Sequence, residues 1–320
     1  MQSLSFFLDF RKSDIRALAS SQTIFNLSEK LLILDEKYNL SNLSINEISD
    51  YKDVSGLYQK YNKYLNNFLK EYMYTDAMII DNEHGHILFS ANFEQYIGKN
   101  LNSGKFINSE MAQVWKKVLD TNETHFSDMH SPTLYIDEPV MLLATPIFKN
   151  KKMISVLMLK LPSTLINSIL HYRASEVKSC ETYAVGRDHL LRSDSFLKKE
   201  LTVKNSFNDH KNCCILTENI DKALKGESGV SVSKDYRGVD VISAYSPFIF
   251  DNITWGVITE MDKIEVTKEL EDIEKSFYIW AVVIALIIFI IGFFVIRTVI
   301  KRSVINPLVA LYQKAKGLKI

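Results

Sequence analysis

Hydrophobic side chains recur every three or four residues in the first quarter of the chain. They do so from Asp14 to Asp35 and again from Ser55 to Tyr72, which is the spacing of one helical face. A polar segment, residues 39–53, separates the two stretches. The pattern predicts a long N-terminal helical region, residues 1–74, whose aromatic side chains belong to a core.

After residue 74 the pattern changes to short apolar runs of the length typical of strands. In order, it predicts a hairpin (75–90), a short helix (111–119), strands (124–128, 140–146 and 153–159) and a helix that begins at Pro162-Ser163. The same order then recurs, with a hairpin at 181–195 and strands at 240–248 and 253–261. This repeat predicts two tandem units, 75–172 and 173–276. Each is a mainly antiparallel sheet with helices, so the fold class is α+β.

One stretch, residues 277–296, carries no charged side chain. Its length matches the hydrocarbon core of a bilayer, and Tyr278 and Trp280 lie at one end, as in an aromatic belt. A buried helix of a large soluble domain is the alternative, but a helix of this length that is apolar on all sides favours a membrane span. Basic residues follow it, so the C-terminus is predicted to be cytoplasmic and residues 1–276 extracytoplasmic.

The N-terminus does not supply the export signal that this orientation requires. Its apolar residues are interrupted by Asp9, Arg11 and Lys12, which fits neither a signal peptide nor a first membrane helix. We therefore expect the chain to lack a first membrane helix at its start, as a fragment would.

Composition and motifs limit the remaining function classes. The 320 residues are 47% apolar and 24% charged, with a formal net charge of zero, so no basic surface for nucleic acid is expected. The three cysteines, Cys180, Cys213 and Cys214, allow one bridge from Cys180 or three free thiols, and we expect thiols. The sequence contains no GxSxG, HExxH, P-loop or GxGxxG motif, which predicts no enzyme activity and no cofactor.

Several segments resemble a known sensor family. FSDMHSP, PVMLLATPI and LPSTLINSIL are similar to its first unit, and TYAVGRDHLLRSDS, KDYRGVDVISAYSPF and WGVITEMD to its second. The family is the double-Cache sensing region of bacterial chemoreceptors and related sensor kinases and nucleotide cyclases. The resemblance covers roughly residues 57–296 and implies two tandem PAS-like Cache units ahead of the membrane helix.

The resemblance also implies a function. It predicts extracytoplasmic sensing of a small molecule and signal transduction across the cell (inner) membrane, as in a methyl-accepting chemotaxis protein. In residues 297–320, Val304, Leu308 and Leu311 are spaced by four and three, and Pro307 lies near the helix start. This segment resembles the start of a HAMP linker, which implies a homodimer and a cytoplasmic output domain that is not in this chain.

Candidate ligand contacts follow from the family's pocket, which is formed by the concave sheet face and the loop over it. In the first unit they are Phe126, Asp128, His130, Tyr135 and Thr145, and in the second Tyr183, Arg192, Asp194, Tyr236, Arg237 and Tyr245. In the second unit, Arg192 with Asp194 and Asp235 with Arg237 are alternatively structural ion pairs, the interpretation that we prefer there.

Two further observations leave the ligand open. The amino-acid-binding subfamily carries an Arg, Trp and Tyr cluster and an aspartate after its last strand. Here Trp115 is followed by two lysines, and the last strand ends in Lys160-Leu161-Pro162, which puts amino-acid sensing in doubt. A carboxylate ligand, a cation or no ligand remains open. His84 and His86 lie at a predicted turn without a third ligand set by spacing, so we expect no metal.

Three other functions remain as alternatives. The same sensing region could serve a histidine kinase or a nucleotide or diguanylate cyclase. The chain could also be a membrane-anchored extracytoplasmic enzyme, in which case Asp128 and His130 are the residues to mutate. A degenerate fragment without function is the third alternative.

Overall fold

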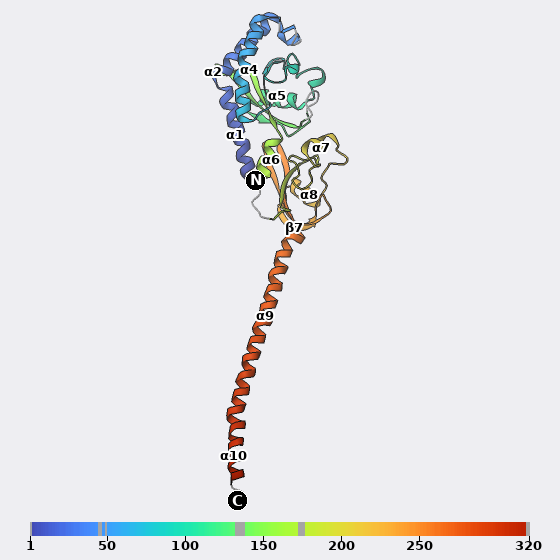
Figure 1. The fold of residues 1–320 in the computed structure, drawn as a ribbon. Coiled ribbons are helices and arrows are strands. Elements are labelled where there is room, and N and C mark those ends of the chain that lie inside the picture. The colour runs from blue at the N-terminus through green and yellow to red at the C-terminus, as the bar shows by residue number, and fades with distance from the viewer. Residues whose placement is uncertain (1, 44–46, 49, 132–137, 172–176, 318–320) are drawn as a thin grey trace. The chain divides into compact units, whose positions relative to one another are not determined.

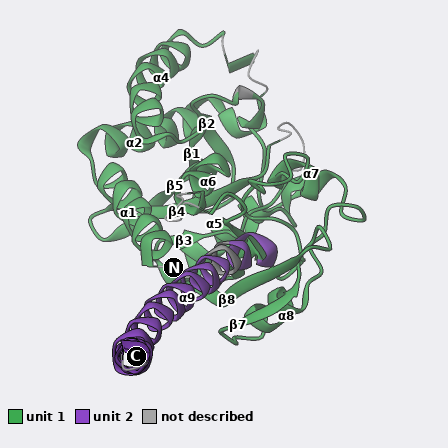
Figure 2. Cartoon of the chain, turned by 60° about the horizontal axis from the view of Figure 1, so that its bottom comes forward, with its two compact units in different colours: residues 1–262 green, residues 263–320 purple. Residues whose placement is uncertain are grey.

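The computed structural model describes residues 2–317 except 44–46, 49, 132–137 and 172–176 (Figure 1). The chain divides into two compact units, Met1–Asp262 and Lys263–Ile320 (Figure 2). The first unit holds the N-terminal helices and two antiparallel sheets, and the second consists of helices. The predicted α+β fold class is confirmed.

Helices form the start of the first unit. They are α1 (Gln2–Ala19), α2 (Gln22–Tyr38), η1 (Leu40–Asn42) and α4 (Lys52–Tyr72). The helix predicted from Asp14 to Asp35 is interrupted, because the hydroxyl of Ser21 accepts a hydrogen bond from the Ile24 amide and begins a new helix. Ser55, where the second helix was predicted to begin, lies inside α4.

The first sheet has the strand order β2-β1-β5-β4-β3. Its strands are β1 (Asp76–Asp81), β2 (Ile87–Ser90), β3 (His125–Phe126), β4 (Val140–Lys149) and β5 (Lys152–Pro162). The predicted hairpin over 75–90 is confirmed, since Met78 pairs with Ser90 and Ile79 with Phe89. Short helices accompany the sheet: η2 (Glu94–Tyr96), η3 (Gly104–Phe106), α5 (Glu110–Thr121) and α6 (Thr164–Leu170).

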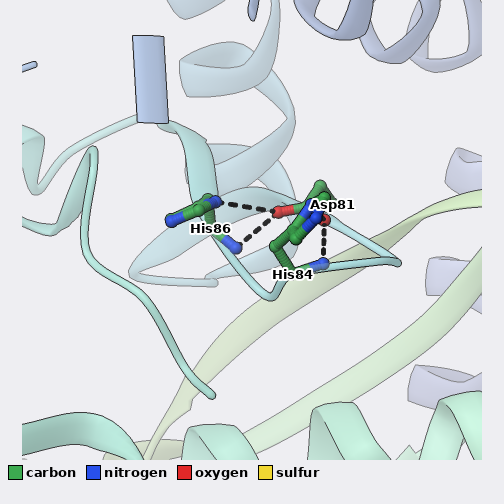
Figure 3. Close-up of side chains that lie close together, drawn as sticks. All are labelled: Asp81, His84 and His86. Atoms are coloured by element: carbon green, nitrogen blue, oxygen red, sulfur yellow. Dashed lines mark hydrogen bonds and ion pairs between the residues drawn. The ribbon is translucent and has the colours of Figure 1, made fainter. Parts of the chain in front are cut away.

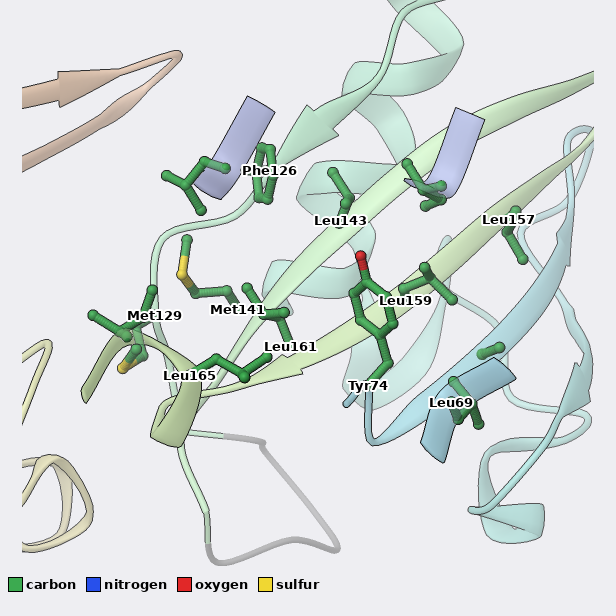
Figure 4. Packing of buried hydrophobic residues seen from close by; sticks show 14 of the residues in the cluster. Leu69, Tyr74, Phe126, Met129, Met141, Leu143, Leu157, Leu159, Leu161 and Leu165 are labelled. Atoms are coloured by element: carbon green, nitrogen blue, oxygen red, sulfur yellow. The ribbon is translucent and has the colours of Figure 1, made fainter. Parts of the chain in front are cut away.

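Both faces of this sheet are buried, because alternate side chains along a strand point to opposite sides. Leu143, Leu157 and Leu159 belong to one hydrophobic cluster, together with residues of the N-terminal helices such as Leu69 (Figure 4). Met158 and Trp115 belong to a second cluster on the side of α5. A strand that is covered on both faces requires a nearly continuous apolar run, and β5 has one from Met153 to Leu161, interrupted by Ser155 and Lys160.

The second sheet has the order β6-β9-β8-β7. Its strands are β6 (Glu181–Gly186), β7 (Gly229–Lys234), β8 (Asp240–Phe250) and β9 (Ile253–Asp262), and its helices are α7 (Val203–Asn208) and α8 (Glu218–Leu224). The hairpin predicted over 181–195 forms only its first strand, and a single bridge joins Val185 to Leu191. The fourth strand is instead β7, which alternates half-buried and exposed residues at the sheet edge.

One carboxylate joins the two sheets. Asp128, which follows β3, accepts hydrogen bonds from Arg192 Nε at 3.0 Å and Nη2 at 2.9 Å, and from Trp255 Nε1 on β9 at 2.7 Å. The Arg192 side chain is 3% exposed, so its charge depends on this partner and on Asp188. The guanidinium lies against the backbone of Gly186, where any larger residue would collide with it.

The second unit is helical throughout its described length. It contains α9 (Lys263–Ile300), the π-helical turn η4 (Lys301–Ile305) and α10 (Asn306–Gly317). Within the described residues, this is the one region that is long and apolar enough to cross a membrane, by length and composition. The helix predicted to run from Lys263 into the apolar stretch without a break is confirmed. Residues 318–320 of the tail lie outside the described part.

The first prediction concerns the link between the sheets. Asp128→Ala should lower the free energy of unfolding by about 3 kcal/mol, because it leaves the buried Arg192 charge without its bidentate partner. Urea unfolding of the full chain in detergent micelles, followed by circular dichroism, measures this.

A double-mutant cycle separates this pair from general damage to the fold. Adding Arg192→Met to Asp128→Ala should cost less than the sum of the two single changes, since the unpaired charge is then gone. Asp188→Ala, which removes the more exposed partner of Arg192, should cost under about 1 kcal/mol. Additive effects in the cycle would contradict the pairing.

Candidate ligand site

A buried pair of charges lies on the α5 side of the first sheet. Asp76 on β1 and Lys160 on β5 are cross-strand partners, with side chains 0% and 1% exposed. Asp76 is held by the Ser90 hydroxyl at 2.8 Å and by the amides of Ala91 and Asn92, each at 3.1 Å. The carboxylate is therefore stabilised by donors from the β1–β2 hairpin, independently of the lysine.

The Lys160 ammonium is less well satisfied. Its Nζ lies 3.8 Å from Asp76 Oδ2, which is too far for a hydrogen bond, and it has no hydrogen-bond partner in the described structure. It lies 3.8 Å from the centre of the Tyr96 ring and 4.8 Å from that of Phe93. Burial lowers the pKa of Lys160 to about 8 and raises that of Asp76. The site thus presents a desolvated ammonium without an acceptor of its own.

His130 adds a polar group to the same region. Burial lowers its pKa to about 4, with the Lys160 charge contributing in the same direction, so the imidazole is neutral at neutral pH. Its backbone pairs with Val140 at the start of β4. A neutral imidazole near an ammonium that lacks a hydrogen-bond acceptor suits a ligand that brings an anionic group and hydrogen-bonding atoms.

The other first-unit candidates lie elsewhere. Asp128 is committed to the link between the sheets. Phe126 is fully buried in the cluster that includes the N-terminal helices, and its ring meets that of Phe250 edge to face at 5.6 Å. Thr145 is on the same side and hydrogen bonds Thr124 at 2.8 Å, because its odd position on β4 points away from α5. Tyr135 lies outside the described residues.

The second-unit candidates divide between the sheet link and local ion pairs. Arg192 does not pair with Asp194, whose carboxylate accepts from Asn167 Nδ2 and the Val203 amide, each at 2.7 Å. The alternative ion pair of Arg237 with Asp235 is present at 2.6 Å, and Arg237 also binds Asp262.

Tyr183 and Tyr245 share one face of the second sheet, because both pair directly with Ile258. The Tyr183 and Tyr236 rings meet at 5.5 Å, and Tyr236 donates a hydrogen bond to Glu181. Tyr245 also borders a groove of about 300 Å³, and Lys222 Nζ on α8 lies 5.9 Å from the centre of its ring.

Two glutamates of the second sheet were not among the predicted residues. Glu181 on β6 and Glu260 on β9 are cross-strand partners, and both are buried. Burial raises the pKa of Glu260 to about 8, with Asp235 and Glu181 adding to the effect. Glu260 interrupts the apolar strand WGVITEMD as Lys160 interrupts MISVLMLKLP. An ionisable residue inside an apolar run that predicts a buried strand is the sequence signal that identifies Glu260.

A third polar group lies at the β1–β2 turn (Figure 3). His84 Nδ1 and His86 Nδ1 lie 3.8 and 3.6 Å from oxygens of Asp81, and the three ligand atoms lie within 4.8 Å of one another. Asp81 is therefore a third potential metal ligand, which the sequence spacing did not show. Its carboxylate already accepts hydrogen bonds from the amides of Glu83, His84 and His86, which accounts for its position as the cap of the turn.

Comparison with known proteins gave structural matches only. No protein-family model matches the chain, and no curated protein matches it in sequence. The periplasmic sensory domain of the Campylobacter jejuni chemoreceptor Tlp1 is 17% identical with a TM-score of 0.45, covering 77% of this chain and 92% of that one.

Two further matches are of the same kind. The ligand-binding domain of C. jejuni Tlp3 in complex with L-norvaline is 14% identical with a TM-score of 0.49, covering 82% and 86%. The sensor domain of the V. cholerae histidine kinase DctB is 14% identical with a TM-score of 0.42, covering 78% and 98%. All three are described as sensory, ligand-binding or sensor domains.

Glu260 makes stability depend on pH. Its pKa is higher in the folded chain than the usual 4.5, so its contribution is fully present below about pH 4.5 and is lost as pH rises toward 8. Glu260→Gln should remove this loss, on the order of 4 kcal/mol, and flatten the profile between these limits. Urea unfolding at a series of pH values measures it; an unchanged slope in the variant would contradict the assignment.

The Asp81 turn gives a second prediction. Asp81→Ala should lower the free energy of unfolding by about 2 kcal/mol, because three backbone amides lose their acceptor. If the residue only caps the turn, the loss is the same with and without a chelator in the buffer. A loss that appears only without the chelator would show that a metal ion is bound by Asp81 and the two histidines.

Proposed function

We propose that this chain is the extracytoplasmic sensing region, membrane helix and first relay segment of a bacterial signal-transducing receptor, and that its first sheet binds a small carboxylate ligand at Lys160. The observation that carries the proposal is the buried Lys160 ammonium, which has no hydrogen-bond acceptor in the described structure. Asp76 forms an ion pair with it at 3.8 Å but is too far away to accept a hydrogen bond, and a carboxylate is the acceptor that an ammonium recognises best.

The surroundings of Lys160 define the ligand further. The Tyr96 and Phe93 rings provide apolar walls, and the neutral His130 offers a hydrogen-bonding group. Asp76 already accepts several hydrogen bonds and repels a second carboxylate, so the ligand's anionic group has to approach Lys160 from the side away from Asp76. A compact monocarboxylate with an apolar body fits these conditions.

The membrane arrangement is part of the same proposal. Residues 277–296 span the cell membrane, residues 1–276 lie outside, and the basic segment from Arg297 faces the cytoplasm. Within the outer part, residues 1–74 form the helical stalk, and 75–172 and 173–276 the two Cache units. The apolar seam that begins at Val304 supports a homodimer.

Signalling in this scheme needs two arrangements of the outer part. The ligand changes the populations of the two arrangements only if it binds one of them more tightly than the other. The coupling free energy between a ligand site and a distant region is usually about 1–3 kcal/mol. No catalytic role is assigned to any residue of the chain. Chemotaxis, kinase and cyclase outputs are all compatible with this sensing region.

Thermal unfolding of the full chain in nanodiscs tests the ligand class. A panel of small carboxylates should contain one that raises the melting temperature, because a ligand at 100 times its dissociation constant stabilises the fold by about 2.7 kcal/mol. Lys160→Met should lose this response and keep the fold.

The matched control is Lys152→Met, which removes an exposed lysine from the same strand and should retain the response. Two results would overturn the ligand class: a response that survives in Lys160→Met, or an equal response to the neutral amides of the same compounds. A wild-type chain that responds to no carboxylate in the panel would count against ligand binding at Lys160.

A further inference from the structure

The two sheets carry a buried carboxylate in the same place. Asp76 on β1 faces Lys160 on β5, and Glu181 on β6 faces Glu260 on β9. Asp76 accepts from the hydroxyl of Ser90 and the next two amides along the chain, and Glu181 accepts from the hydroxyl of Ser195 at 3.2 Å and likewise from the next two amides. The two positions are therefore equivalent in strand pairing and in hydrogen bonding.

The partner position differs in charge. Where the first sheet has the ammonium of Lys160, the second has the carboxylate of Glu260, which is 2% exposed. Its Oε1 has no hydrogen-bond partner in the described part of the chain. Two carboxyl groups thus face each other across neighbouring strands at the place where the first sheet has an ion pair.

Two neutral oxygens beside Glu260 are also without partners. Ser243 on β8 is its other cross-strand partner, and Tyr183 is its diagonal neighbour on β6. The Ser243 hydroxyl and the Tyr183 hydroxyl are both buried, and neither has a hydrogen bond within the described residues. Three oxygen atoms without a hydrogen bond in the described structure thus lie on one sheet face: two hydroxyls, which can donate or accept, and a carboxyl oxygen. Burying polar groups that are not fully hydrogen-bonded is costly.

The neighbouring charges do not neutralise this set. The hydrogen bonds of Arg237 go to Asp235 and Asp262. Glu181 is occupied by Tyr236, Ser195 and two amides. The group that is missing is a compact cation that donates several hydrogen bonds.

We propose that the second sheet binds the ammonium group of a small amine, or the ammonium ion itself, between Glu260, Ser243 and Tyr183, at the position that Lys160 Nζ has in the first sheet. An ammonium donates to three acceptors and packs against an aromatic ring, and Tyr183 supplies a ring as well as a hydroxyl. A hard metal ion would need six or more oxygen ligands, and Glu181 has little capacity left. The burial of all three residues restricts the ligand to a small one.

Thermal unfolding of the full chain in nanodiscs at about pH 9, where Glu260 is mostly ionised, tests this site. Methylammonium chloride and ammonium chloride are the probes, with sodium, potassium and calcium chloride at matched ionic strength. Wild type should gain several degrees in melting temperature with the ammonium salts and not with the metal salts.

Variants assign the response to Glu260. Glu260→Gln should lose the response, whereas Glu227→Gln, an exposed change in the same unit, should keep it. Glu260→Lys places an ammonium opposite Glu181, as in the first sheet, so it should melt above wild type without any amine and should not respond to one.

Three results would overturn the proposal: no ammonium response in wild type, a response that persists in Glu260→Gln, or an equal response to a metal salt. If Glu260→Lys does not fold, the presence or absence of an ammonium response in Glu260→Gln still tests the proposal. The carboxylate response assigned to Lys160 is measured separately, so either site can fail without the other.

Discussion

The ion pair between Asp128 and Arg192 is the constraint on which the rest of the first unit depends. It joins a loop of the first sheet to a side chain of the second, and Trp255 brings β9 to the same carboxylate. Separating the buried Arg192 guanidinium from the Asp128 carboxylate costs several kcal/mol, on the order of 3–5. Movement of the two sheets past each other at this point carries that cost. A change in either sheet is therefore transmitted at a fixed contact.

Each sheet buries an ionisable side chain, Lys160 in the first and Glu260 in the second, and this burial lowers the stability of the fold. Lys160 and Glu260 lie at corresponding positions on β5 and β9, the strands that have neighbours on both sides. A central strand cannot move its side chains to the surface, so these charges stay desolvated. Such positions favour function over stability, because apolar residues of similar size would pack there at less cost.

Local patterns predicted much of this fold. Apolar runs located β1, β4, β5, β8 and β9, and the uncharged stretch located the long apolar helix. The edge strand β7 was missed because serines and exposed valines give no buried-strand signal. Asp128 and Arg192 were placed in separate pockets, since nothing local shows that residues 64 positions apart share a bond. Thr145 lies on the face of the first sheet away from Lys160. Strand alternation assigns it to one face or the other, but the sequence alone does not say which helices cover that face.

The equivalence of Lys160 and Glu260 has a consequence for the history of the chain. Lysine and glutamate codons differ at their first base alone, so one point mutation converts either sheet's buried group into the other's. A single base change at either codon therefore exchanges an amino group for a carboxyl group at this position, without any change to the strands, the hairpin serines or the carboxylate beside them.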